Sequence, residues 1–343
     1  MKKLDIQNFA KSPMVPPLLM LLLLAVIPLV ISGYYLHSII LILMYTVLGS
    51  AWNWLGGFAG QMSMAHAAFY GVGAYVCGCC QVWWEMNPWI ATLISVVIVG
   101  LFSILVGLPV FRLKGHYFSI ATIAIGEIIK TLFINWEAAG GAVGLYLPIR
   151  QNSFANFQFR SKVPYYYIIM LLAALAVGIT YWLKNSKNGY YFRAIKENPD
   201  AAKALGINIV GSKLLAITLS GMFCALAGSF YVNYVLYIDP DGMFRFLTSV
   251  QIALIAVMGG MGTVWGPLIG SVIIIALSEG SRTFLGGMGA GLDLVIYGLL
   301  IMLIAVYQPG GIVGAVETWK RRRKQQHATA KSKAGRESKE VAE

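Results

Sequence analysis

No aspartate, glutamate, lysine or arginine occurs between Lys11 and Glu85. One transmembrane helix needs about 20 apolar residues in a row, so this stretch is long enough to cross a bilayer several times. The chain of 343 residues is 58% hydrophobic and only 12% charged, whereas roughly 25% of the residues in typical soluble proteins are charged. Because lipid cannot satisfy exposed backbone N–H and C=O groups, we expect an all-α, polytopic bundle of transmembrane helices.

Apolar runs separated by charges, proline and glycine predict about ten membrane spans. They form one transmembrane domain, 14–315, between a cytoplasmic N-terminus, 1–13, and a basic cytoplasmic tail, 316–343, which we expect to be disordered. Two of these spans, 247–259 and 267–280, are too short to cross the membrane alone if straight. We expect broken helices there, buried by their neighbours. The expected spans are about 14–36, 38–57, 64–84, 89–111, 117–135, 164–183, 214–237, 247–259, 267–280 and 290–308.

The basic residues predict the orientation of these spans. With the N-terminus inside, the N-terminus and inner loops carry eleven basic residues and the outer loops carry five, while nine of the 26 follow Trp319. This asymmetry is the positive-inside pattern of a multi-pass protein of the bacterial inner membrane. The basic tail suits contact with anionic membrane lipid. The net charge of +12 is therefore explained by topology, and we expect no nucleic-acid partner.

Motifs for catalysis, metal binding and nucleotide binding are missing from the sequence. Cys77, Cys79 and Cys80 have no second cysteine cluster or nearby histidine, so we expect no metal site. The segment from Gly206 to Lys213 has serine before lysine, the reverse of a phosphate-binding loop, and no buried strand leads into it. We therefore expect no cofactor, no ATP binding by this chain and no enzymatic activity.

The long polar stretch 184–213, which contains six lysines and arginines, interrupts two apolar runs. Within it, Pro199 suits the first position of a helix, and Asp200 opposes the positive end of the helix dipole. The small residues Ala201 and Ala202 permit close seating in the cleft of a partner, and Gly206 can end the helix in a left-handed conformation. We expect a cytoplasmic docking helix here. The alternative is an ordinary amphipathic connector.

The same segment resembles the EAA signature of ABC importer permeases. That signature reads Glu-Ala-Ala, three residues, Gly, nine residues, then Ile-x-Leu-Pro. Here Asp200 replaces the glutamate, ten residues separate Gly206 from Ile217, and Ser220 follows Leu219 where the signature has proline. The match is partial, and the resemblance implies that an ATP-hydrolysing subunit presses on this loop.

Further blocks along the chain widen the resemblance to the branched-chain amino-acid ABC permeases of the LivM type. They occur in the order of that family between about 45 and 314. One segment departs from the family: Gly140 to Gly144 reads GGAVG where a polar residue usually precedes the last glycine, which leaves the substrate open. The blocks are WNWLGGFAGQMSMAHAAFYGVGAY (52–75), RLKGHYFSIAT (112–122), RAIKENPDAAKALGI (193–207), MGGMGTVWGP (258–267) and QPGGIVG (308–314).

The resemblance implies a permease that moves leucine, isoleucine and valine by alternating access. It also implies two cytoplasmic ATPase subunits, a second homologous permease and an extracytoplasmic solute-binding protein. A urea or short-amide importer permease is the alternative within the class; an ion-coupled carrier and a membrane enzyme are the alternatives outside it. The residues expected to couple to the ATPase are Arg193, Glu197, Pro199, Asp200, Ala201, Ala202 and Gly206.

Polar residues inside apolar runs are the remaining candidates, because such groups face partners or water-filled paths. Glu127 and Lys130 are three apart on one helical face, so we expect either an intrahelical pair or a role along the path. Each of the other candidates can instead make a hydrogen bond between helices. The candidates for the substrate path are Gln61, Ser63, His66, Glu127, Asn233 and Gln251.

Overall fold

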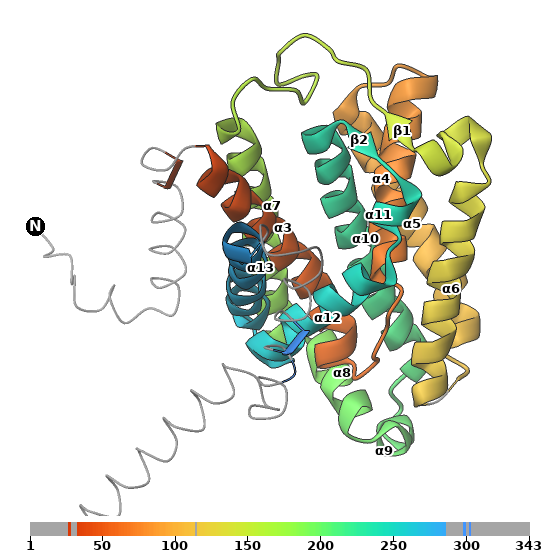
Figure 1. The fold of residues 1–343 in the computed structure, drawn as a ribbon. Helices are drawn as coiled ribbons and strands as arrows, with labels where there is room; N and C mark the ends of the chain where they lie inside the picture. Colours follow the sequence, from red (N-terminus) through yellow and green to blue (C-terminus); the bar gives the residue numbers. More distant parts are fainter. Residues whose placement is uncertain (1–26, 29–32, 114, 286–297, 300–301, 303–343) are drawn as a thin grey trace, which may run out of the picture.

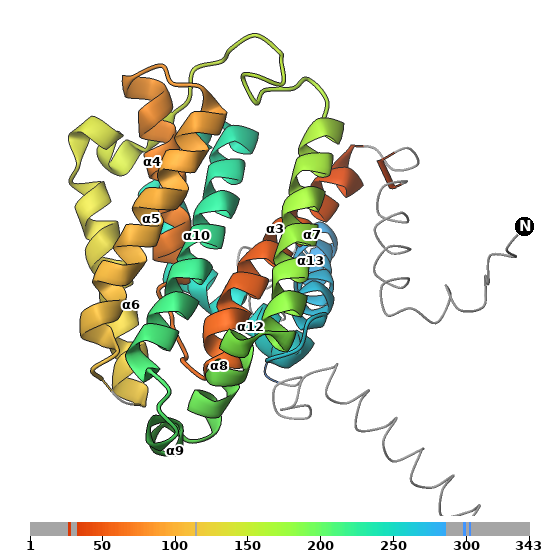
Figure 2. The same ribbon diagram turned by 180° about the vertical axis from the view of Figure 1, so that it is seen from behind.

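The structure, a computed structural model, describes residues 27–28, 33–113, 115–285, 298–299 and 302. The expected N-terminal segment, most of the first span, most of the last span and the basic tail lie outside these residues. The described part is a helical bundle (Figures 1 and 2), so the expected fold class is confirmed. Six of its helical segments are long and apolar enough to cross a membrane: Tyr34–Phe58, Pro88–Val110, His116–Ile134, Val163–Asn185, Ile209–Val235 and Pro240–Gly260.

The helices follow the apolar runs of the sequence. Where two strands occur, Leu145 pairs with Ile238 and Tyr146 with Tyr237 in an antiparallel ribbon. The elements are α3 (Tyr34–Trp52), the π-helix η1 (Asn53–Phe58), α4 (His66–Trp83), α5 (Pro88–Val110), α6 (His116–Ile134), η2 (Glu137–Ala139), η3 (Gly141–Val143), β1 (Leu145–Tyr146), α7 (Val163–Asn185), α8 (Lys187–Glu197), α9 (Pro199–Ala204), α10 (Ile209–Val235), β2 (Tyr237–Ile238), α11 (Pro240–Met243), α12 (Phe246–Gly260) and α13 (Gly266–Leu285).

The two short spans expected at 247–259 and 267–280 have different structures. The span expected at 247–259 is a broken helix: α11 and α12 are separate pieces joined at Phe244 and Arg245. At a rise of about 1.5 Å per residue, the 15 residues of α12 are shorter than a hydrocarbon core of about 30 Å. The span expected at 267–280 lies in α13, which runs for 20 residues from Gly266 to Leu285. Its apolar part is Gly266–Gly280, close to the short stretch that the sequence predicts.

Small residues set the close contacts between the helices, as expected for a glycine-rich membrane protein. A side chain added at Gly73 of α4 would meet the backbone of Ala225 in α10, and one added at Gly228 would meet the carbonyl of Tyr70. On the other side of the bundle, Gly270 of α13 approaches the backbone of Ile255 in α12 in the same way. Among the six candidate spans, Tyr34–Phe58, which comprises α3 and η1, is the most buried, with 78% of its apolar window covered, against 17% for α6.

The polar segments gather at the two ends of the bundle. α8 and α9 project from one end, while the loop after α6 and the β1–β2 ribbon lie at the other (Figures 1 and 2). The charge pattern of the sequence predicts that the end with α8 and α9 faces the cytoplasm.

Candidate functional site

The docking helix expected from the sequence is α9. Asn198 caps it, since its side-chain oxygen accepts hydrogen bonds from the backbone N–H groups of Asp200 and Ala201, both at 3.0 Å. Pro199 occupies the first turn. Gly206 has a φ of 81°, and the backbone N–H groups of Gly206 and Ile207 return to the carbonyls of Lys203 and Ala202, which is a Schellman ending. The helix ends at Ala204.

The two faces of α9 have different surroundings. Ala202 is 2% exposed, so its methyl group packs within this chain. Ala201 is exposed and Leu205 is 80% exposed. Leu205 therefore leaves a large apolar side chain exposed at this end of the bundle. The outward face therefore consists of Ala201, Leu205 and their neighbours rather than of Ala202.

Arg193 and Glu197, the other expected coupling residues, lie on α8. The guanidinium of Arg193 donates to the carbonyl of Lys184 at 2.7 Å and stacks over the ring of Tyr190 at 4.6 Å from its centroid. These contacts hold the corner between α7 and α8, so Arg193 positions the segment. Glu197, the last residue of α8, is exposed.

Two polar contacts connect α8 to the interior of the bundle. The ammonium group of Lys196 donates to the carbonyl of Gly57 in η1 at 2.9 Å. Asn53, at the start of η1, accepts from the N–H of Gly262 at 2.7 Å and donates to the carbonyl of Thr263 at 2.9 Å. Gly262 and Thr263 form the turn between α12 and α13. The π-helix is thus bonded on one side to α8 and on the other to the α12–α13 turn, and such π-helical turns are frequent at functional sites.

Five of the six candidates for the substrate path, among them Glu127, which is described below with Lys130, do not line the large cavity. His66 Nε2 is 2.8 Å from the Ser220 hydroxyl, and Asn233 bonds to Gln81 at 3.1 Å. These are hydrogen bonds between α4 and α10, the alternative role considered for such residues. Ser63 is buried beside Trp52, whose indole N–H donates to the Ser63 carbonyl. Gln61 lies in the loop before α4 and reaches the carbonyl of Ala59.

Gln251 is the candidate that lines a cavity. The cavity has a volume of about 730 Å³ and lies between α3, α10, α12 and α13. The Tyr45 hydroxyl donates to Gln251 Oε1 at 3.3 Å. Other lining residues include the aliphatic Leu41, Met44, Leu254 and Ile275, the tyrosines 70, 231 and 237, and the charged Asp239, Arg245 and Glu279.

The cavity offers opposite charges close to an apolar wall. Arg245 immediately precedes α12, and the side chain of Arg245 makes no cap there. Asp239 accepts a hydrogen bond from the N–H of Gly242 at 2.7 Å, which fixes its carboxylate at the start of α11. A ligand with a cationic group, an anionic group and an aliphatic part would find a counterpart for each. The tyrosines of this cavity could not be predicted, because they look like core residues of the apolar runs.

The segment that departs from the family lies beside this cavity. Gly140 and Gly144 both have a φ of 93°, a conformation that favours glycine. A side chain at Gly144 would meet the carbonyl of Ile238, and the Tyr237 hydroxyl donates to the carbonyl of Val143 at 2.9 Å. Because Tyr237 and Ile238 line the cavity, this glycine segment supports one of its walls from behind.

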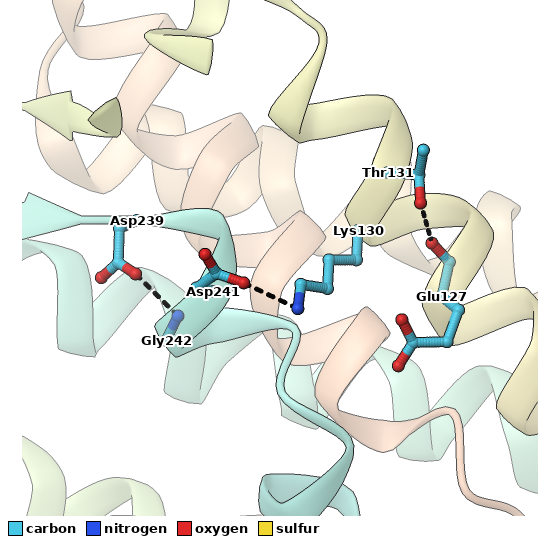
Figure 3. A network of polar contacts seen from close by, with 6 residues as sticks. All are labelled: Glu127, Lys130, Thr131, Asp239, Asp241 and Gly242. Carbon is cyan, nitrogen blue, oxygen red and sulfur yellow. Dashed lines mark hydrogen bonds and ion pairs between the residues drawn. The ribbon is translucent and has the colours of Figure 1, made fainter. Parts of the chain in front are cut away.

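The intrahelical pair of Glu127 and Lys130, one of the two alternatives for these residues, does not form. Lys130 Nζ lies 2.7 Å from Asp241 Oδ1 on α11, as Figure 3 shows. Glu127 shares the helix with Lys130, but only its backbone carbonyl takes part in the network, as the acceptor for Thr131. The correction has a simple cause: the spacing of three along a helix cannot reveal a competing carboxylate more than a hundred residues away.

Comparison with known proteins identifies what the chain is similar to. Residues 34–305 match the family described as the permease component of branched-chain amino acid transport systems. The high-affinity branched-chain amino acid permease protein LivM of Salmonella typhimurium is 25% identical over 86% of this chain and 74% of its own. LivM of Escherichia coli is 26% identical over the same shares. The fructose import permease protein FrcC of Rhizobium meliloti is 32% identical over 43% of this chain and 41% of its own. No solved structure matches.

Proposed function

The chain belongs to the permease family of branched-chain amino acid transport systems, and from this premise we propose that it is the subunit through which leucine, isoleucine and valine are imported. It is a multi-pass membrane permease of the ABC importer class and is not itself an enzyme. The proposal concerns the cargo, the partners and the residues that form the path.

The cavity between α3, α10, α12 and α13 is the observation that carries the choice of cargo. A branched-chain amino acid is a zwitterion with an aliphatic side chain. Arg245 can attract its carboxylate, and Asp239 with Glu279 can attract its ammonium group. Leu41, Met44 and Ile275 offer an apolar wall to the side chain. The volume of about 730 Å³ is within the range of ligand pockets and leaves room for loose, weakly selective binding.

Gln251 belongs to the path in this proposal, since it faces the cavity beside Tyr45. Ser63, His66 and Asn233 support the path from the bundle interior through their hydrogen bonds. Gln61 lies in the loop between η1 and α4, next to the contacts of α8. Weak selectivity in the permease is physically sufficient if a solute-binding protein on the outer side selects the cargo.

The driving force comes from two ATP-hydrolysing subunits that dock on α9 of this chain and on its counterpart in a second, homologous permease. Closure of the ATPases pushes Pro199–Ala204. The push reaches η1 through the Lys196 to Gly57 hydrogen bond and then the α12–α13 turn through Asn53. Because the opposite parts of α12 and α13 line the cavity, a tilt of these helices would open it alternately to the two sides.

A reconstituted importer tests the cargo. The complex of both permeases, both ATPases and the binding protein is placed in liposomes, and ATP-dependent uptake of labelled leucine, urea and fructose is compared. We expect uptake of leucine and competition by isoleucine and valine. Uptake of urea or fructose without uptake of leucine would overturn the assignment of cargo but leave the importer class in place.

A urea or short-amide importer permease remains the second candidate. Urea is neutral and has no aliphatic part, so the charged residues Asp239 and Arg245 and the aliphatic wall would have no counterpart on it. The same uptake assay separates the two cargoes.

A further inference from the structure

The short helix α11 carries charged groups of one cavity wall. Asp239 immediately precedes this helix, and Arg245 follows its last residue by two positions. Both line the cavity, and so do Gly242 and Met243 of the helix itself. A single turn of helix is not stable in isolation, because its formation fixes several residues for few hydrogen bonds. The directions in which Asp239 and Arg245 point therefore depend on what holds α11 in place.

α11 is fastened to α6 at two points that do not line the cavity. Lys130 Nζ of α6 lies 2.7 Å from Asp241 Oδ1. The ring of Phe244, the residue after α11, stacks on the ring of Phe133 in α6, with the centroids 5.0 Å apart. It also stacks on Tyr75 of α4 at 5.7 Å. Asp241 and Phe244 are three residues apart, a spacing that places them on the same side of a helical turn.

The two attachments hold α11 in different ways. The ring of Phe244 is buried and fixes the depth of the segment, but apolar contacts are not directional and allow the segment to roll. The Lys130–Asp241 pair is a directional, charge-assisted contact. Figure 3 shows the Asp241 carboxylate directed toward Lys130 and the Asp239 carboxylate on the side away from Lys130. A roll of α11 would therefore turn Asp239 out of its place in the cavity wall.

We propose that Lys130 is a positioning residue for the cargo, and that its ion pair with Asp241 holds α11 so that Asp239 and Arg245 face the cavity. Lys130 does not line the cavity and acts through α11. The inference rests on the proposed function, in which Asp239 attracts the ammonium group and Arg245 the carboxylate of a branched-chain amino acid. Loss of the pair should weaken discrimination by charge and spare the contact with the ATPase, because α9 lies at the other end of the bundle (Figure 1).

Direct binding to the complex of two permeases and two ATPases tests the proposal. Saturation-transfer NMR in detergent compares leucine with isoamylamine, which is leucine without its carboxylate, and the preference is the ratio of the two dissociation constants. We expect Lys130→Met and Asp241→Asn each to lower this preference by about threefold, a modest change because the pair is partly exposed. Co-purification of the ATPase should not change, whereas a merely structural role would lower it.

Reversal of the ion pair gives the sharper test. Lys130→Asp alone should lower the preference, and the addition of Asp241→Lys should restore most of it, because the pair can form again in the opposite sense. Lys130→Met combined with Asp241→Asn should lose no more than either variant alone, as expected for two residues that act through one contact. The matched control is Glu137→Gln, since Glu137 is an exposed acid in η2, shortly after α6, and does not line the cavity. This control should keep the wild-type preference.

The remaining outcomes count against the proposal. Wild-type preference in both Lys130→Met and Asp241→Asn, or an equal loss in Glu137→Gln, would overturn the positioning role and leave the proposed cargo intact. A loss that the reversed pair does not restore would also overturn it, because Lys130 would then act other than through Asp241. If the wild-type complex itself binds leucine no better than isoamylamine, the assignment of this cavity to a zwitterionic cargo fails, and the role of Lys130 fails with it.

Discussion

Lys196 on α8 donates a hydrogen bond of 2.9 Å to the carbonyl of Gly57, and this bond joins the helix before α9 to the π-helix η1. The aliphatic stem of Lys196 also lies over Gly60, where an added side chain would meet it at 2.9 Å. The amine is thus held in place by packing and by the carbonyl together. This contact can transmit a push on α9 to the centre of the bundle.

We expect Lys196→Met to uncouple ATP hydrolysis from transport. Methionine keeps most of the stem but cannot donate, and a hydrogen bond from a charged group is worth about 1.5–3 kcal/mol. Uptake should fall by about tenfold, while ATPase assembly remains normal. The measurement is uptake per ATP hydrolysed in liposomes.

Lys187→Met is the matched control, because Lys187 is an exposed lysine on α8 outside the contact with η1. It removes the same charge from the same segment. Equal losses in both variants would show that charge on the segment, and not the bond to Gly57, matters.

Asn53→Leu should lower the thermal stability of the chain. Asn53 is fully buried, and its loss leaves the N–H of Gly262 and the carbonyl of Thr263 without their partner. Each unsatisfied buried group costs about 1–3 kcal/mol. The thermal midpoint in detergent is the measurement, with Asn185→Leu on the exposed end of α7 as the control; equal midpoints for Asn53→Leu and the control would contradict the role of Asn53.

The sequence predicted α9 well because the signals that form it are local. Pro199 and Gly206 act within a few residues of themselves, and their roles at the start and end of the helix can be read from chemistry alone. The Asn198 cap is equally local. The bonds of Asn53 and the Lys130–Asp241 pair join residues more than a hundred positions apart. Only the packing of the helices brings such partners together, so spacing along the chain could not predict them.

The sequence did not predict the cavity, for a different reason. Its tyrosines count as hydrophobic residues in an apolar run, and nothing local indicates that several of them face the same space. Gln251 was found because an amide inside an apolar run is conspicuous. His66 and Asn233 are equally conspicuous but bond to neighbouring helices, because a buried polar side chain satisfies itself wherever a partner is near.

The two alanines of α9 should respond differently to a bulky side chain. Ala202 packs inside this chain, so Ala202→Trp should lower its thermal stability, as overpacking costs about 1–3 kcal/mol. Ala201 is exposed, so Ala201→Trp should leave stability unchanged but block docking of the ATPase. Co-purification of the ATPase and the thermal midpoint are measured together.

Asn185→Trp, at an exposed position just before α8, should change neither quantity. If Ala201→Trp assembles and transports normally, α9 is a solvated connector and not a docking helix.

Replacement of Arg245 tests the cavity. Arg245 lines it and is the cation that would attract the carboxylate of the cargo, so Arg245→Gln should lower the maximal rate of leucine uptake by about tenfold, which corresponds to about 1.4 kcal/mol. Assembly with the ATPase and its basal hydrolysis should remain, because α9 lies at the other end of the bundle (Figure 1). The control is Arg160→Gln, since Arg160 is exposed in the loop between β1 and α7 and does not line the cavity. Removing the Arg245 guanidinium should also weaken the preference for leucine over an uncharged analogue such as isobutyramide, because only leucine has a carboxylate that Arg245 can attract. If both arginine variants transport leucine at the wild-type rate, the cavity does not recognise the carboxylate of the cargo.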